Sequence, residues 1–424
     1  MKQPAATRRG LLATTGAALL AGCTGGDTTD EPPTISPIRL HQFVDNEPEL
    51  VVADSRPVNI DRAELAASAE RVQSVLATLP LPFGADSVPN GHIRQRLTDA
   101  AREATDRVAE ARTAPNRLAA LNSLRRARSR ARYAAAGWAF VADDQTATAL
   151  ETERNAAVSE AESIRADYRY LGTDPVTAAL VHGLIEHHLD DVIDHSAPSR
   201  GETSQLLTVA EWGEQAEAAQ AHLDAVEHLS TQFESSLPAE AGSVESSLSA
   251  AVETLTAALQ QQQEGLPATP SDAENSLTAR LRNRLRDEGL ERVDRVPHAP
   301  GPASGLIAAT DAAAALLAHG RFEDALGDDD SFGAETASAV GTIRSTAVDA
   351  ITTALDEAPR SDLARPVLAT IARSVQFADQ ELNRISRDVR PTRLDDPIAR
   401  YRAATLRARS VPTACQRTLD ALEE

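Results

Sequence analysis

The chain has 424 residues, of which 42% are hydrophobic and 25% charged, and its formal net charge is −21 at pH 7. This length is enough for one or two hydrophobic cores, and the negative charge argues against nucleic acid as a partner, because the phosphate backbone would be repelled. Lys2 is the only lysine, so P-loop, pyridoxal and protein-kinase chemistries, each of which needs a lysine, are excluded for the rest of the chain.

Residues 1–22 have the parts of an export signal in the expected order. Arg8 and Arg9 precede an apolar stretch of roughly a dozen residues, which is too short to span a bilayer, and Leu-Ala-Gly directly precedes Cys23. The paired arginines resemble the signature of the twin-arginine (Tat) pathway, and Leu-Ala-Gly-Cys resembles the box at which lipoprotein signal peptidases cut. The resemblance implies a lipid on Cys23 and anchoring to the outer face of the cell membrane, with a Sec signal or a short membrane helix as the alternative.

The composition indicates the solvent in which the protein works. The chain is acidic and rich in alanine, and only 3% of its residues are aromatic. Together with the scarcity of lysine, this composition resembles that of exported haloarchaeal proteins, for which high salt screens self-repulsion. An acidic protein of another GC-rich organism is the alternative. With a lipid on Cys23, Cys415 is the one cysteine left, so we expect no intrachain disulfide.

Two segments precede the helical part of the chain. Residues 23–37 start at the expected lipidation site and continue with glycine, proline, threonine and acidic residues, so we expect a flexible tether there. Residues 38–60 contain two short runs of β-type residues, 40–44 and 50–53, separated by a turn-like Asp-Asn-Glu-Pro sequence. We therefore expect a small N-terminal β-hairpin over residues 38–60.

From residue 61 onward the pattern is helical. Alanine, leucine, arginine and glutamate dominate, and apolar residues recur at intervals of three and four. Leu-Gly-Thr-Asp-Pro at residues 171–175 predicts the end of one helix and the start of another, with aspartate as the N-cap. We expect an all-α, multi-helix bundle of about a dozen helices, with one helical unit over residues 61–265 and a second, packed on the first, over residues 266–424.

The helix expected over residues 174–195 is rich in histidine and aspartate. A helical wheel places His188, Asp191 and His195 on one stripe beside the buried face. Since His188 and His195 would lie about 10.5 Å apart along the axis and metal–nitrogen bonds measure about 2 Å, all three cannot easily hold one ion. A pair from this stripe, completed by His222 of the following helix, would suit zinc, iron, nickel or copper. The alternative is a solvated or hydrogen-bonded couple without a ligand.

Arginines cluster in two runs, at residues 125–132 and 280–286. Arginines at alternating positions fan around a helix, so we expect them to form ion pairs with acidic neighbouring helices. The functional alternative is docking on anionic membrane headgroups or binding of an anionic ligand.

Taken together, the patterns favour a binding or scaffolding module over an enzyme. The catalytic motifs HExxH, CxxC and GxSxG are absent from the sequence. We expect an unknown protein or small molecule as partner, besides the membrane. The alternative function is a metal-binding helical bundle, in transport or in metal-dependent catalysis, that uses His188, Asp191, His195 and His222 with a transition metal as cofactor.

Overall fold

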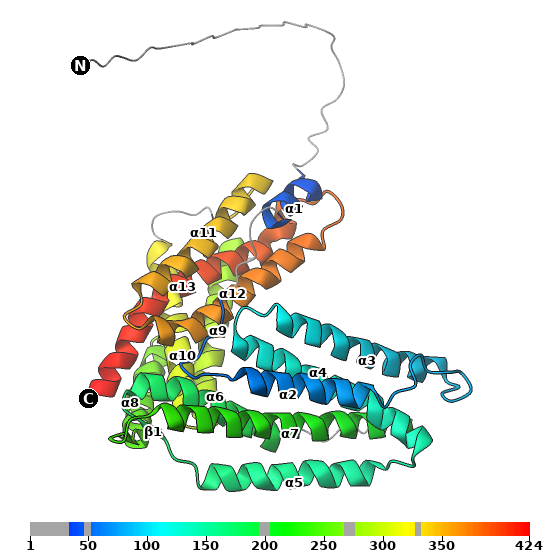
Figure 1. Cartoon of the computed structure of the whole chain (residues 1–424). Helices are drawn as coiled ribbons and strands as arrows, with labels where there is room; N and C mark the ends of the chain where they lie inside the picture. Colours follow the sequence, from blue (N-terminus) through cyan, green and yellow to red (C-terminus); the bar gives the residue numbers. More distant parts are fainter. Residues whose placement is uncertain (1–33, 46–51, 195–203, 267–275, 327–331) are drawn as a thin grey trace, which may run out of the picture. The chain divides into compact units, whose positions relative to one another are not determined.

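The computed structural model describes residues 34–45, 52–194, 204–266, 276–326 and 332–424 (Figure 1). These residues belong to one compact unit that spans Thr34–Glu424. Arg8, Arg9 and Cys23 of the expected export signal lie outside the described residues, and so does His195.

Thirteen α-helices make up most of the described residues. Helices α1 to α7 are Pro37–Asp45, Arg62–Leu76, Gly91–Arg112, Arg117–Ala142, Ala147–Ala166, Pro175–Ile193 and Gln205–Ser236. Helices α8 to α13 are Glu245–Glu264, Leu277–Arg295, Pro302–Ala325, Ala337–Glu357, Ser361–Asn383 and Asp395–Glu423, and two short 3-10 helices are Val296–His298 and Pro391–Leu394. The expected all-α class with about a dozen helices is confirmed. None of the described helices has both the length and the apolar content needed to cross a membrane.

The described residues contain one small antiparallel sheet. Its strands, β1 (Leu171–Gly172) and β2 (Gly242–Ser243), pair Leu171 with Ser243 and Gly172 with Gly242. This short ladder joins the segment before α6 to the segment before α8.

The β-hairpin expected over residues 38–60 is wrong. Pro37–Asp45 form helix α1, and residues 52–60 contain no strand. Leu40 is fully buried, and Phe43 packs closely over Gly341 of α11. Because residues three apart lie on the same face of a helix, α1 turns both side chains toward the helices it contacts, α11 and α12. Tertiary packing therefore overrides a weak local preference for strand.

The residues directly before α1 are packed against the rest of the protein. Ile35, which the sequence assigns to the tether, is buried and forms an isolated antiparallel bridge with Val389. The Ile35 backbone N–H donates to the Val389 carbonyl at 2.8 Å. The apolar side chain and this bridge attach the segment to the body of the protein.

Helices α2, α3 and α7 all pack against α4, and α5 packs against α7 (Figure 1). The contact between α4 and α7 is close because α7 carries Gly213 at the crossing. A Cβ atom added at Gly213 would lie 2.3 Å from the Cβ of Ala136. Two long helices that approach this closely form a rigid support for the side chains between them.

Helix α6 contacts helices from both parts of the chain, with α7 on one side and α10 on the other. Helix α10 also packs against α8, α9 and α13, and α13 packs against α11 and α12. The largest apolar cluster accordingly contains residues from both sides of residue 265, such as Ile185 and Leu306. The division into two helical units at that position stays a prediction.

Candidate functional site

The local sequence determines where α6 starts and which face it buries. Asp174 is the N-cap, its carboxylate accepts a hydrogen bond from the backbone N–H of Thr177 at 3.2 Å, and a proline follows it. Ile185 is fully buried in the core. This burial fixes the rotation of the helix, so that His188 and Asp191 lie beside side chains of α4 and α7.

Three of the four expected metal ligands lie together. His188 Nδ1 and His222 Nδ1 are 3.0 Å apart, and His222 Nδ1 is 3.4 Å from Asp191 Oδ2. Each of the three residues offers one ligand atom, and these atoms lie within 4.8 Å of one another. Both histidines are buried, whereas the Asp191 side chain is about half exposed. The fourth residue, His195, lies outside the described residues.

Arg125 of α4 is inserted among these side chains. Its Nη1 lies 3.1 Å from His188 Nδ1 and 2.7 Å from both ring nitrogens of His222. A donor that is equally close to both nitrogens of one ring cannot point along the lone pair of either, so the contact with His222 is poorly aligned. The Asp191 carboxylate is 3.9 Å from the same Nη1. Arg125 is therefore a buried cation without a close carboxylate partner.

Burial lowers the pKa values of His188 and Arg125 and so favours their neutral forms. Burial lowers the pKa of His188 to about 3, and the charge of Arg125 acts in the same direction. Burial likewise lowers the pKa of Arg125 to about 10, although Asp191 opposes this shift. At neutral pH His188 is thus a neutral imidazole and Arg125 a guanidinium cation. His188 Nε2 is buried and has no hydrogen-bond partner among the described residues.

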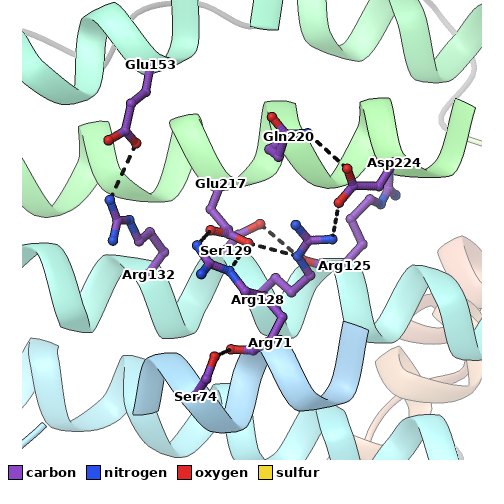
Figure 2. A network of polar contacts seen from close by, with 10 residues as sticks. All are labelled: Arg71, Ser74, Arg125, Arg128, Ser129, Arg132, Glu153, Glu217, Gln220 and Asp224. Atoms are coloured by element: carbon purple, nitrogen blue, oxygen red, sulfur yellow. Dashed lines mark hydrogen bonds and ion pairs between the residues drawn. The ribbon is translucent and has the colours of Figure 1, made fainter. Parts of the chain in front are cut away.

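Other arginines of the run in α4 are fully paired. Arg128 donates from Nε to Glu217 Oε1 at 2.8 Å and from Nη1 to Asp224 Oδ2 at 2.6 Å (Figure 2). Arg71 of α2 donates to the other oxygen of Glu217 at 2.7 Å. This network joins α2, α4 and α7, so the role of Arg128 is structural.

The same pattern holds for the next two arginines. Arg130 contacts Glu103 at 2.9 Å and Glu214 at 3.1 Å, and Arg132 contacts Glu153 at 3.4 Å. In the second run, Arg280 pairs with Asp396 of α13 and Arg282 with Glu323 of α10, whereas Arg284 pairs with Glu288 of its own helix. The expectation that the runs form ion pairs with acidic neighbouring helices is confirmed for these residues except Arg284.

Arg125 and Arg126 differ from the rest of their run. The nearest carboxylate to Arg125 is that of Asp191 at 3.9 Å. Arg126 is exposed, and among the described residues it takes part in no hydrogen bond or ion pair. Arg126 is therefore the more accessible of the two to a ligand, whereas Arg125 also contacts His188, His222 and Asn122.

Two clefts meet at this pair of arginines. The α4–α7 cleft, of about 610 Å³, is bordered by acidic side chains of α3 and α7 in addition to Arg125, Arg126 and His222. The α6–α10 cleft, of about 580 Å³, is bordered by α4, α6, α10, α12 and the segment before α2. Both clefts also reach Asp191, so the His–Asp–Arg cluster forms the wall between them.

The α6–α10 cleft is basic, unlike the protein as a whole. Five arginines and three histidines line it, against three aspartates. The arginines are Arg56, Arg125, Arg126, Arg295 and Arg373. Arg56 forms an ion pair with Asp54 at 3.0 Å, and its side chain is nine-tenths buried. Its Nη1 nevertheless has no hydrogen-bond partner among the described residues. An unpaired buried donor beside a solvent-accessible cleft is a suitable contact for an anion.

Other polar residues of α6 have structural roles that the sequence did not indicate. The carboxylate of Glu186 accepts backbone N–H groups of Ala303 at 3.1 Å and Ser304 at 2.6 Å, in the first turn of α10. His182 contacts the hydroxyl of Tyr168 at 2.6 Å and the carbonyl of Leu171 at 2.8 Å. These contacts hold α6 in place relative to its neighbours and leave neither residue available for a ligand.

Comparison with known proteins relates the two parts of the chain to two families. Residues 63–240 match the model of a family described as domain of unknown function DUF8262, and residues 245–420 match that of domain of unknown function DUF8264. No curated protein and no solved structure matches the chain. The cluster of His188, Asp191, His222 and Arg125 lies within the first matched part, whereas the α6–α10 cleft takes its lining from both parts and from Arg56 before them.

Proposed function

We propose that the protein is a binding module for an anionic small molecule, which it holds in the α6–α10 cleft. The proposal rests on one observation, namely which arginines of the run at residues 125–132 form close ion pairs with carboxylates. Arg125 and Arg126 remain without a close carboxylate in a run whose described neighbours are paired at 2.6 to 3.4 Å. Both line the cleft, together with the incompletely bonded Arg56.

Charge and size support an anionic ligand of small-molecule dimensions. A buried guanidinium is stabilised by a carboxylate or phosphate group that accepts its N–H bonds, and such charge-assisted bonds are stronger than neutral ones. A volume of about 580 Å³ lies within the range of small-molecule sites. In a chain of net charge −21, long-range attraction of anions is absent, so selectivity would come from these local groups.

The site of action follows from the N-terminal signal. We propose that cleavage before Cys23 and lipidation of that residue anchor the protein to the outer face of the cell membrane. The acidic composition supports a haloarchaeal, extracytoplasmic setting. The protein would then present its basic cleft to solutes outside the cell.

Calorimetric titration tests the binding proposal, with citrate and pyrophosphate as probes and the purified whole chain in molar potassium chloride. We expect one of the two anions to bind with one-to-one stoichiometry. The Arg126→Ala variant should bind about tenfold more weakly or worse, because one charge-assisted contact is lost. Arg126 is exposed, so this change leaves the core intact.

Arg102→Ala is the matched control for the loss of one positive charge. Arg102 is exposed, is paired with Asp99 on α3, and lies away from both clefts. The affinity of this variant should equal that of the unchanged protein. Absence of binding of either anion, or an equal loss of affinity in the two variants, would refute the proposal.

A further inference from the structure

The cluster between α4, α6 and α7, which borders the α6–α10 cleft, also contains donors that suit a metal ion. His188 and His222 each direct Nδ1 to one point, and Asp191 adds Oδ2 from the solvent side. Two of these donors are on α6 and one is on α7, so helices fix their positions. Two imidazole nitrogens and one carboxylate oxygen form a set that suits divalent transition metals better than calcium or magnesium.

Two of the three distances between donor atoms match those of a metal site, and all three lie within 4.8 Å. In a tetrahedral site with bonds of about 2 Å, neighbouring donor atoms lie about 3.3 Å apart. His188 Nδ1 and His222 Nδ1 are separated by 3.0 Å, and His222 Nδ1 and Asp191 Oδ2 by 3.4 Å. At 3.0 Å one imidazole donates its Nδ1–H to the Nδ1 of the other, and a metal ion bound by both nitrogens would replace that proton.

A cation of the protein, the Arg125 guanidinium, lies beside the two imidazoles. Arg125 Nη1 is within 3.1 Å of His188 Nδ1 and within 2.7 Å of His222 Nδ1. The guanidinium therefore lies against the two ring nitrogens, where its positive charge opposes the binding of a metal ion to them. Its poor alignment with the His222 ring indicates that the pocket fits a guanidinium group imperfectly.

We propose that His188, Asp191 and His222 form a binding site for one divalent transition-metal ion, and that Arg125 closes this site by placing its guanidinium among the donors. Metal binding then requires the Arg125 side chain to turn away. The α4–α7 cleft offers space for that movement, since Arg125 lines it. Glu211 and Glu214, which pair with Arg96 and Arg130, line the same cleft and make it a favourable place for the displaced guanidinium.

The test is a titration of the whole chain, free of any histidine tag, with Co²⁺, whose visible absorption reports the ligand set. We expect Arg125→Ala to bind one equivalent of Co²⁺ at least about tenfold more tightly than the unchanged protein, because a competing positive charge is removed. The visible spectrum should be that of a site with nitrogen and oxygen ligands. Equal affinity of the two proteins, or no stoichiometric binding by Arg125→Ala, would overturn the proposal.

Two further variants separate this effect from a general change of charge or fold. Arg102→Ala removes one positive charge on α3, away from the donor set and from both clefts, and should leave Co²⁺ affinity as in the unchanged protein. Asp191→Asn in the Arg125→Ala background replaces an exposed ligand with an isosteric amide, so the fold is kept while Co²⁺ affinity falls again. Survival of tight binding in this double variant would contradict the assignment of the ligands. The titration uses no anion probe, so its result is independent of the proposed anion binding.

Discussion

At the scale of single residues, the buried carboxylate of Glu186 is placed where the end of a helix satisfies it. Glu186 is 3% exposed, yet both of its oxygens accept N–H groups at the start of α10. A carboxylate at this position also interacts favourably with the positive end of the helix dipole. Gly301 leaves the room for it, since an added Cβ would lie 2.3 Å from Glu186 Oε1 and 2.8 Å from the Tyr170 hydroxyl.

Gly301→Ala should therefore destabilise the protein. The new methyl group would push Glu186 off the backbone N–H groups of α10, and we expect a loss of roughly 1–3 kcal/mol in the free energy of unfolding. Denaturant unfolding in molar salt measures the change. Gly320→Ala is the control, because Gly320 is an exposed position inside α10 with nothing within 4 Å of its added Cβ, and alanine there should stabilise the helix by about 0.5–1 kcal/mol. Equal effects of the two substitutions would contradict this account.

The site residues differ in how far their positions could be predicted from the sequence. The stripe of His188 and Asp191 follows from helical periodicity alone. His222 could be named because the following helix was expected to pack beside it. Arg125 could be assigned to a run of arginines but not to the histidine cluster, because its partner depends on which turn of α4 faces which turn of α6 and α7. Arg56 lies outside any regular element, so no periodicity indicated its position.

At the scale of secondary-structure elements, caps and ion pairs connect α6 to the C-terminal helices. Asp174 is the N-cap of α6, and it also accepts a hydrogen bond from Arg360 Nη2 at 2.7 Å. Arg360 is the residue before α12 and is held in addition by Asp362. Burial alone would raise the pKa of Asp174, but the bonds from Arg360 and Thr177 lower it to about 2.

Two substitutions of Asp174 separate the effect of its N-cap hydrogen bond from the effect of its negative charge. Asp174→Ala removes both and should cost about 1–2 kcal/mol of unfolding free energy at pH 7, whereas Asp174→Asn keeps an N-cap oxygen and should cost less. The pKa of Asp174 is lower in the folded state than in the unfolded state, so its negative charge stabilises the fold above about pH 4, the pKa of a free aspartate. This contribution is lost as the pH falls toward 2 and the carboxylate takes up a proton. Urea unfolding of both variants between pH 7 and pH 3 measures the free energy of unfolding. The difference in this free energy between Asp174→Asn and the unchanged protein should shrink on acidification. A difference that widens would contradict the stabilising role of the Asp174 charge.

Helices with strong start and stop signals were predictable from sequence, and those set by tertiary contacts were not. Asp-Pro at residues 174–175 gives the start of α6, and Gly265 is the C-cap of α8, as its position at the end of an apolar stripe indicates. Ser36 and Pro37 give a similar signal at the start of α1, which the expected hairpin left out of account. Helix α1 has only nine residues, and the burial of Leu40 against α11 and α12 stabilises it.

At the scale of the whole molecule, excess negative charge determines the conditions under which the fold is stable. Removal of residues 1–22 takes away Lys2, Arg8 and Arg9 and no acidic residue, which changes the net charge from −21 to −24. Many arginines are paired with acids across helices, but the remaining carboxylates repel one another. Salt screens this repulsion, since the Debye length falls from about 10 Å at 0.1 M to about 3 Å at 1 M.

We therefore expect the melting temperature to rise by several degrees as potassium chloride increases from about 0.1 M to 1 M and above. Circular dichroism at the helical band follows the transition. A neutral osmolyte at matched osmolality should reproduce only part of the effect, because it is excluded from the surface but screens no charge. A melting temperature that is insensitive to salt, or that the osmolyte restores in full, would count against charge repulsion as the cause.

The proposed anchor leads to a separate expectation at this scale. Expressed in a haloarchaeal host, Cys23→Ser should move the protein from the membrane fraction to the soluble or secreted fraction, because the lipid attachment point is lost. Cys415→Ser is the control: Cys415 is fully buried in α13, and burial raises the pKa of its thiol to about 12, so this cysteine is unreactive. Retention of Cys23→Ser in the membrane fraction would show that another segment anchors the chain.

The central claim, an anion held by Arg125 and Arg126 in the α6–α10 cleft, is tested most directly by anomalous diffraction from crystals of the whole chain grown with selenate. Selenate is an oxyanion whose selenium atom can be located independently of the protein atoms. We expect an anomalous peak within hydrogen-bonding distance of the guanidinium groups of Arg125 or Arg126 in the cleft, and its loss in crystals of Arg126→Ala. A cleft without a peak, while selenate occupies exposed arginines such as Arg102 elsewhere on the surface, would contradict the account.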